Sequence, residues 1–294
     1  AHLRMVPCEP RGEMSRRYGT VQGVVMLQLL SLGAGVQSST LALMAAAGEV
    51  IPMPDGAIFA DTGGEPKAVY AWLDWLTVQL PYPVYKVTHG DLWKAASTPK
   101  CTRDGERVYI GTSIPVYMLG VDGKKGLGMR QCTRDFKINM ITQQARKCLG
   151  LKRVTKDAGA LVTMWIGIST DEAHRMKPNR EPWITTRWPL IDAGMSRTDC
   201  FTWMEKHGYP RPPRSACTYC PFHDDKSWLG LTSEEFADAV AKEKQIQSAY
   251  AQTTEMRGVP YFHASRVPLD QVLFDPNDAN GKAFGNECEG ICGV

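Results

Sequence analysis

One segment near the start of the chain constrains the fold most: an apolar run that ends in a loop of small residues. Residues 24–32 are almost all apolar and predict a buried β-strand. The loop Gly33-Ala34-Gly35 follows, and residues 41–47 predict a helix that ends at Gly48. A strand, a tight loop and a helix N-terminus bring backbone N–H groups and the positive end of a helix dipole together. The segment therefore predicts a site for a phosphate or sulfate group.

This loop differs from the two commonest phosphate-binding motifs. It lacks the Gly-Lys-Ser/Thr of a Walker A loop and the third glycine of a dinucleotide-binding loop. An ordinary Gly-rich turn between strand and helix is the alternative interpretation. The residues expected to surround the anion are Ser31, Gly33, Ala34, Gly35, Val36, Gln37, Ser38, Ser39 and Thr40.

Length and composition describe an ordinary globular protein. The 294 residues fit one large domain with or without appendages, and 43% are hydrophobic and 22% charged. No apolar run approaches the roughly 20 residues of a membrane span. Residues 1–25 are expected to form an extension outside the fold, and their polar, basic start lacks the apolar core of a signal peptide. We therefore expect a cytoplasmic protein. A net charge of +3 does not by itself indicate nucleic-acid binding.

Downstream, predicted strands and helices alternate. Strands are expected over 55–61, 83–87, 160–168 and 183–191, and helices over 67–80, 135–149, 196–207 and 233–256. This order predicts an α/β fold with a parallel sheet and right-handed crossovers. Residues 90–130 lack periodicity and predict a long loop or lid. The nucleotide-binding domain is expected to span 26–230, and a helical extension with a cysteine tail 231–294.

Polar clusters follow three of the predicted strands. The loop described above follows the first, Asp61 and Thr62 the second, and Ser169 to Arg175 a later one. Ligands of open parallel sheets bind at the carboxyl ends of the strands. Asp61 is expected to hold a ribose or a metal, or else to cap the next helix. Arg175 is expected to contact a phosphate or sulfate oxygen, or else to pair with Glu172.

Nine cysteines point to metal or redox chemistry, because an odd number argues against a complete disulfide framework. Cys217 and Cys220 form a Cys-x-x-Cys knuckle, whose two thiolates can grip one metal ion or one corner of a cluster. Structural zinc and iron–sulfur remain open on spacing alone.

Several motifs together resemble those of one family. The Gly33–Ser38 loop resembles that of the PP-loop pyrophosphatases, the adenine nucleotide alpha hydrolases, with Gln37 in the place of an aspartate. The segments beginning at Asp61, Arg130 and Gly167 are similar, in this order, to segments of the PAPS (phosphoadenylyl sulfate) reductases. The resemblance implies an adenine nucleotide alpha hydrolase-like fold that binds ATP, PAPS or APS (adenylyl sulfate), with Lys137 and Arg175 among its catalytic residues.

The resemblance also bears on the cysteines. In APS reductases and in PP-loop enzymes that transfer sulfur to DNA or tRNA, similar cysteines hold a 4Fe-4S cluster. The implied ligands here are Cys132, Cys217 and Cys220, with Cys288 or Cys292 as the fourth or with one iron left open. Zinc is the alternative metal. Cys288 also resembles the nucleophilic tail cysteine of the reductases. It is therefore expected to serve either as a cluster ligand or as the nucleophile.

Three functions follow as hypotheses. The first is ATP-dependent adenylation, with Mg²⁺, and sulfur transfer to a nucleic-acid or small-molecule acceptor, served by a sulfur-donor protein. The second is reduction of PAPS or APS to sulfite with a thioredoxin-like partner. Gln37 favours this one, since it removes a carboxylate suited to Mg²⁺. The third is a non-catalytic, zinc-bearing nucleotide sensor or nucleic-acid adaptor. A homodimer is compatible with each.

Overall fold

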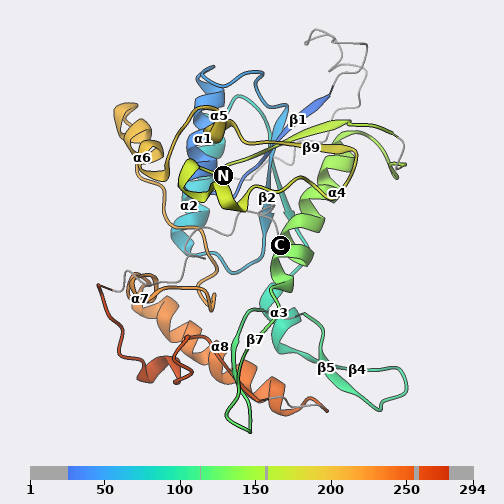
Figure 1. The fold of residues 1–294 in the computed structure, drawn as a ribbon, viewed down its shortest axis with the longest axis vertical. Coiled ribbons are helices and arrows are strands. Elements are labelled where there is room, and N and C mark those ends of the chain that lie inside the picture. Colours follow the sequence, from blue (N-terminus) through green and yellow to red (C-terminus); the bar gives the residue numbers. More distant parts are fainter. Residues whose placement is uncertain (1–25, 113, 156–157, 255–257, 278–294) are drawn as a thin grey trace.

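The computed structural model describes residues 26–112, 114–155, 158–254 and 258–277. Its centre is a five-stranded sheet (Figure 1). The strands are β1 (Leu27–Ser31), β2 (Gly56–Asp61), β3 (Val84–Thr88), β8 (Val162–Ile166) and β9 (Ile184–Arg187). They lie in the order β3-β2-β1-β8-β9, and every neighbouring pair is parallel. This confirms the predicted α/β class with a parallel sheet.

The strand order reverses beside β1. The chain first builds β1, β2 and β3 outward in one direction, then returns to place β8 on the other side of β1. Ser31 at the end of β1 lies in register with Ile58 of β2 and Ile166 of β8. Loops that leave such a switch point diverge and leave room for a ligand. The Gly33–Ser38 loop starts at this point.

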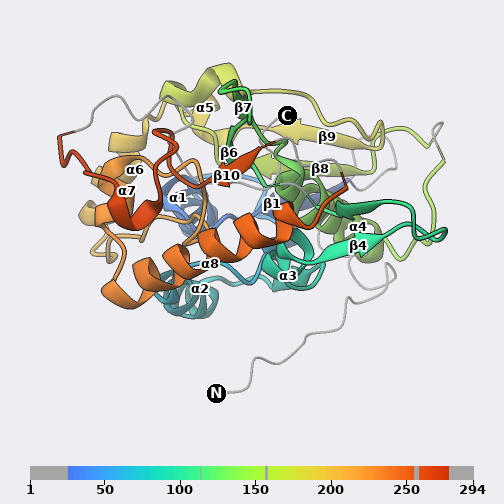
Figure 2. The same ribbon diagram turned by 90° about the horizontal axis from the view of Figure 1, so that it is seen from below.

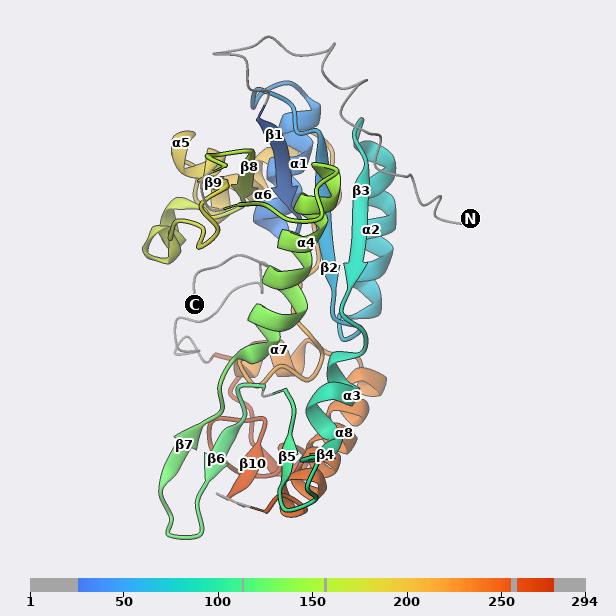
Figure 3. The ribbon, with the colours of Figure 1, turned by 90° about the vertical axis from the view of Figure 1, so that its right-hand side faces the viewer.

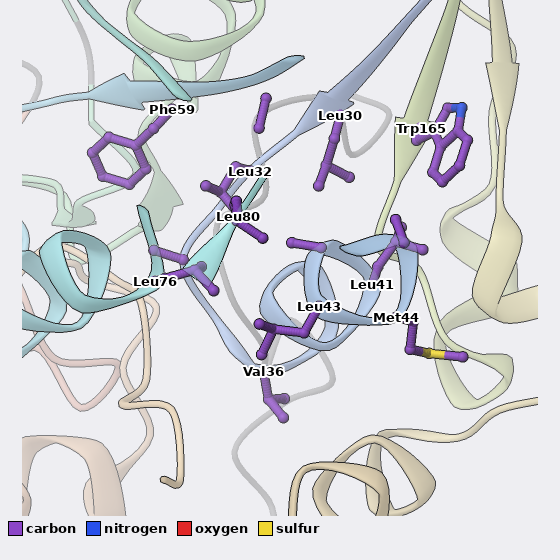
Figure 4. Packing of buried hydrophobic residues seen from close by; sticks show 14 of the residues in the cluster. Leu30, Leu32, Val36, Leu41, Leu43, Met44, Phe59, Leu76, Leu80 and Trp165 are labelled. Carbon is purple, nitrogen blue, oxygen red and sulfur yellow. The ribbon is translucent and has the colours of Figure 1, made fainter. Parts of the chain in front are cut away.

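Helices cover both faces of the sheet. On one face lie α1 (Val36–Ala46), α2 (Lys67–Gln79), the short α5 (Pro189–Asp192) and α6 (Arg197–Lys206), which share a core with β1 and β2. Figure 4 shows Leu41 of α1 packed among Leu30 and Trp165 of the sheet. On the opposite face α4 (Asn139–Cys148) contributes Met140, Ile141 and Ala145 to a second core.

Three predicted boundaries shift for physical reasons. Helix α1 begins five positions before the predicted 41, because buried polar residues fill its first turns and hide the apolar pattern. A π-helical segment, Thr133–Ile138, runs directly into α4. The extended run predicted over 183–191 splits at Pro189, which begins α5 because proline has no N–H to donate and suits a helix start.

The segment predicted as a long lid carries more regular structure than expected. It contains α3 (Leu92–Ser97) and four strands of three residues each, which are too short to show a period. These strands are β4 (Pro99–Cys101), β5 (Val108–Ile110), β6 (Tyr117–Leu119) and β7 (Lys125–Leu127). They form two small antiparallel sheets away from the parallel one (Figure 3).

The C-terminal segment packs with the small antiparallel sheets formed by β4 to β7. It contains α7 (Asp225–Leu229), α8 (Ser233–Ala251) and β10 (Val259–Tyr261), and β10 pairs with β6. Figure 2 shows α8 crossing this end of the molecule beside α3. Trp93 Nε1 of α3 donates to Gln245 Oε1 of α8 at 2.9 Å. Across the described part of the chain, every helix is too short or too polar to cross a bilayer.

Candidate nucleotide site

The loop after β1 is a tight, buried turn held by its own atoms. The Gly33 amide donates to Ser38 Oγ at 3.2 Å, and that hydroxyl reaches the Gly35 carbonyl at 3.4 Å. Ala34 is fully buried and has a φ of 59°, a left-handed conformation that costs a residue with a Cβ roughly 1–2 kcal/mol. Strain of this kind persists only where the surrounding structure holds the backbone in place.

The N-terminus of α1 has neither a side-chain cap nor an acidic residue in its first turn. Its N-cap is Gly35, which has no side chain to accept a hydrogen bond. The first N–H groups of a helix and its dipole favour an anion. The N-terminus of α1 therefore offers backbone N–H groups and a positive dipole of the kind that suits a phosphate or sulfate. Binding of an anion at Gly33–Ser38 remains a prediction.

The residue after β8, Gly167, packs closely against the backbone of this loop. A Cβ on Gly167, just after β8, would lie 2.8 Å from the Ser38 backbone nitrogen and 2.9 Å from its Cα. Both contacts are with backbone atoms, which have little freedom to move. Only glycine at position 167 lets the end of β8 and the first turn of α1 pack this tightly.

The three consecutive hydroxyls Ser38, Ser39 and Thr40 have different surroundings. Ser38 holds the loop as described. Ser39 Oγ accepts from Trp72 Nε1 of α2 at 2.9 Å, and Thr40 Oγ1 donates to the Cys200 carbonyl of α6 at 3.5 Å. These two hydroxyls join α1 to its neighbouring helices. Ser31, at the end of β1, is buried, and its hydroxyl has no hydrogen-bond partner among the described residues.

Gln37 lies at the centre of a buried polar network. Its Nε2 donates to Ser169 Oγ at 3.2 Å and to Glu172 Oε2 at 3.0 Å, and its Oε1 accepts from Arg197 Nη1 at 2.9 Å. Both amide protons and the carbonyl are therefore used. An aspartate at position 37 has no proton to donate to Glu172. The carboxylate beside the loop thus comes from residue 172 instead of residue 37.

Arg175 pairs with Glu172, the alternative considered for it. The Nη1···Oε1 distance is 2.7 Å, and the two side chains are 19% and 5% exposed. The arginine thus stands next to the Gln37 network. Contact of Arg175 with a phosphate oxygen remains a prediction.

At the end of β2, Asp61 organises its own turn. Its Oδ1 accepts from the Gly63 amide and the Tyr70 hydroxyl, both at 2.8 Å, and its Oδ2 lies 2.9 Å from Lys86 Nζ. Burial raises the pKa of Asp61, but the hydrogen bonds from Lys86, Gly63 and Tyr70 outweigh burial and lower it below the usual range. Binding of a ribose or metal by Asp61 remains a prediction.

Lys137 forms a buried ion pair. Its Nζ lies 3.5 Å from Glu65 Oε1, with side-chain exposures of 6% and 1%, and Ser215 Oγ donates to Glu65 Oε2 at 3.0 Å. Thr62 also faces this area, and its Oγ1 lies 3.3 Å from Cys217 Sγ. Lys137 and Thr62 therefore meet beside the cysteine knuckle, at the end of β2.

The knuckle packs on the loop after β2. The Thr218 amide donates to the Gly64 carbonyl at 2.8 Å, and a Cβ on Gly64 would lie 2.7 Å from the Tyr219 hydroxyl. Burial, and next the Glu65 carboxylate, raise the pKa of the Cys217 thiol well above its usual range; Lys137 and Thr62 oppose this. In its present surroundings Cys217 is a neutral thiol.

Cys132, Cys217 and Cys220 all lie near Tyr219. Burial is the main cause that raises the pKa of Tyr219 above its usual range. Within the ranges that the structure describes, however, no three His, Cys, Asp or Glu side chains lie close enough to hold one metal ion. The described residues alone therefore do not fit a cluster. Cys288 and Cys292 lie outside the described residues.

Two contributors to the site, Arg197 and Glu65, were not predicted from the sequence. Arg197 is the first residue of α6, after the capping box of Ser196 and Asp199. The predicted helix over 196–207 already placed Arg197 at a helix start, but nothing in the sequence indicated that its guanidinium reaches Gln37. Glu65 carries no such signal, because only the fold brings it to Lys137.

Comparisons with known proteins give one kind of match. No family model and no curated protein matches the chain. Among solved structures, the chain is similar to phosphoadenylyl-sulfate (PAPS) reductase from Candida auris, in a phosphate complex. The TM-score is 0.37 and the identity 14%, over 64% of this chain and 74% of that chain.

Proposed function

We propose that the protein is a PP-loop enzyme that binds ATP at the Gly33–Ser38 loop and activates an acceptor by adenylation for sulfur transfer. The observation that carries this proposal is the helix N-terminus at Gly35, which no side chain caps, in a strained loop at the switch point of a parallel sheet. A nucleotide phosphate is the ligand that such a site suits best.

In this proposal the chain's residues orient two successive displacements. An oxygen of the acceptor attacks the α-phosphorus of ATP, and pyrophosphate leaves with both electrons of the broken P–O bond. A sulfide-level sulfur from a donor protein then forms a bond to the activated atom of the acceptor, and AMP leaves. The loop amides and the α1 dipole stabilise negative charge on the phosphates. Arg175 and Lys137, if freed from their carboxylates by substrate, would add positive charge.

Gln37 argues less strongly against ATP than its sequence position suggests. A triphosphate needs Mg²⁺, which prefers carboxylate oxygens among protein ligands. Glu172 brings a carboxylate to within 3.0 Å of the Gln37 amide. Position 37 therefore has no carboxylate, but Glu172 places one beside the loop.

Reduction of PAPS or APS is the second candidate, favoured by Gln37, whose amide takes the place of a carboxylate suited to Mg²⁺ in the loop. It needs no Mg²⁺ and releases sulfite. Cys288 remains the proposed nucleophile of this reaction. Thioredoxin-dependent sulfite release that survives Cys288→Ser would refute that role.

An iron–sulfur cluster remains part of the proposal. Cys132, Cys217 and Cys220 would hold it, with Cys288 or Cys292 as the fourth ligand or with one iron left open. Metal analysis of protein purified without oxygen tests it. Iron and sulfide in near-equal amounts would support a cluster. A colourless protein with zinc and no iron would favour the zinc-bearing adaptor.

The two steps are tested together with ATP labelled at the α-phosphate, Mg²⁺, a sulfide donor and candidate acceptors. Adenylation releases unlabelled pyrophosphate, which is assayed separately, and the displacement by sulfur releases labelled AMP. Formation of both, dependent on an acceptor, supports the proposal. Formation of neither, under conditions where PAPS yields sulfite, rejects it in favour of the reductase.

A further inference from the structure

A cationic cavity lies next to the proposed nucleotide loop. It has a volume of about 880 Å³ and opens between the start of α2, α6, the 211–216 segment, α7 and the start of α8. Small-molecule sites have volumes of roughly 300–1,000 Å³, so this one can hold a ligand of nucleotide size. None of residues 31–40 lines it. The cavity is therefore separate from the loop.

Its lining has an excess of positive charge. Five cations line it against two carboxylates, Glu234 and Glu235. Lys67 pairs with Glu234 at 2.8 Å, and Arg214 pairs with Asp224, outside the lining, at 3.0 Å. Arg211 and Lys226 form no ion pair within the described ranges. The remaining cation, Arg197, donates to Gln37.

The arginines of the cavity are held in place before any ligand binds. The guanidinium of Arg211 lies 4.1 Å from the centre of the Phe201 ring, and that of Arg197 lies 5.8 Å from the same ring. Asp224 holds Arg214. Arginine forks held in this way match the paired oxygens of a phosphate, and they lose less side-chain entropy on binding.

One buried polar atom at the cavity wall has no hydrogen-bond partner among the described residues. His223 lines the cavity, and its Nδ1 is buried without a hydrogen-bond partner among the described residues. Burial, and then Arg214, lower the pKa of His223 to about 3, so its ring is neutral at pH 7. A neutral imidazole donates from one nitrogen and accepts at the other.

Arg197 connects this cavity to the loop. It lines the cavity, and the same guanidinium donates to Gln37 in the first turn of α1. A ligand in the cavity would thus lie beside the nucleotide that the loop is proposed to bind. This is the arrangement needed by an enzyme that brings ATP and a second substrate together.

We propose that this cavity binds a phosphate group of the acceptor, and that the acceptor is a nucleotide unit, either within a single nucleic-acid strand or free. Arg197, Arg211 and Lys226 would contact the phosphate. The identification of this ligand as the acceptor rests on the proposed function. The presence of a second phosphate site at Arg211 does not.

The test measures binding of fluorescein-labelled single-stranded RNA and DNA 12-mers to the full chain by anisotropy, over a series of salt concentrations. Unlabelled AMP and inorganic phosphate are titrated in separate arms. Arg211→Gln removes one cavity cation. Arg153→Gln is the matched control, because Arg153 is exposed, lies outside the cavity and loses the same charge. Melting temperatures of both variants check that they fold.

We expect Arg211→Gln to weaken oligonucleotide binding about threefold to tenfold near 0.1 M salt and to reduce the salt slope by about one. Arg153→Gln should change neither. If AMP binds with the same dependence on Arg211 and oligonucleotides do not bind, the acceptor is a free nucleotide. Equal effects of the two substitutions, or no binding of any phosphate probe, would overturn the proposal.

The two proposals fail separately. If oligonucleotide or AMP binding depends on Arg211 but the protein forms no AMP from ATP, the phosphate site is supported and the adenylation activity is rejected. If the protein forms AMP from ATP but acceptor binding does not depend on Arg211, the adenylation activity is supported and the phosphate site in this cavity is rejected.

Discussion

Arg197 Nη1 donates a hydrogen bond to Gln37 Oε1 across 2.9 Å, and this contact joins the first turn of α1 to the cationic cavity. Gln37 also donates to Glu172, so one amide connects an arginine with a carboxylate. Its oxygen faces the cation and its nitrogen faces the anion. Position 37 therefore suits an amide, and neither acid nor base could replace both of these contacts.

Gln37→Glu should destabilise the protein. The substitution keeps the shape but places a second carboxylate about 3 Å from Glu172, where like charges repel, although Arg197 and Arg175 offset part of the cost. We expect a loss of about 1–3 kcal/mol at pH 7, measured by urea unfolding. The loss should shrink at pH 4–5, where the two carboxylates can share a proton. Gln37→Met, which removes the hydrogen bonds without adding charge, is the control and should show no such recovery.

Gly167→Ala should distort the loop. The added methyl would lie 2.8 Å from the Ser38 nitrogen, so backbone has to move. Overpacking of this kind costs about 1–3 kcal/mol. Thermal unfolding and ATP titration should both show a loss. Gly126→Ala is the control, since its methyl would meet only Met118 Cβ at an ordinary 3.4 Å. Unchanged ATP affinity in Gly167→Ala would argue against nucleotide binding at this loop.

Substitutions in the Glu65–Lys137 pair can distinguish a structural role of Lys137 from a catalytic one. Lys137→Met leaves the Glu65 charge buried alone, which costs about 3–5 kcal/mol. The double variant Lys137→Met with Glu65→Gln removes both charges and should recover much of that stability in denaturant unfolding. If Lys137 is catalytic, the double variant should still form no AMP. Restored turnover together with restored stability would assign Lys137 a structural role only.

Asp61 should contribute to the pH dependence of stability. Its pKa is lowered in the folded protein, so its contribution is fully present above the unfolded pKa near 4 and is lost as pH falls through the folded value. Asp61→Asn should therefore destabilise the protein at pH 7 and reduce the steepness of its acid unfolding below about pH 4. Chemical unfolding at a series of pH values measures both effects. An unchanged acid limb would show that Lys86, Gly63 and Tyr70 do not stabilise the charged carboxylate.

The sequence predicted the sheet and its main helices because their apolar runs are long and periodic. It also located the Gly33–Ser38 loop, whose small residues are readable as a strand-to-helix turn. The sequence could not show that the hydroxyls of Ser39 and Thr40 bond to neighbouring helices, because the packing of the helices decides which hydroxyls face the loop. The Gln37–Glu172–Arg197 network joins residues more than 130 positions apart, and no local pattern announces such a contact.

The most direct test of the central claim is the product formed from α-labelled ATP by the wild-type chain, with Mg²⁺, a sulfide donor and single-stranded nucleic acid present. We expect labelled AMP and an equal amount of unlabelled pyrophosphate, and neither product from the Gly167→Ala variant. Intact ATP throughout, with sulfite released from PAPS by the same preparation, would contradict it.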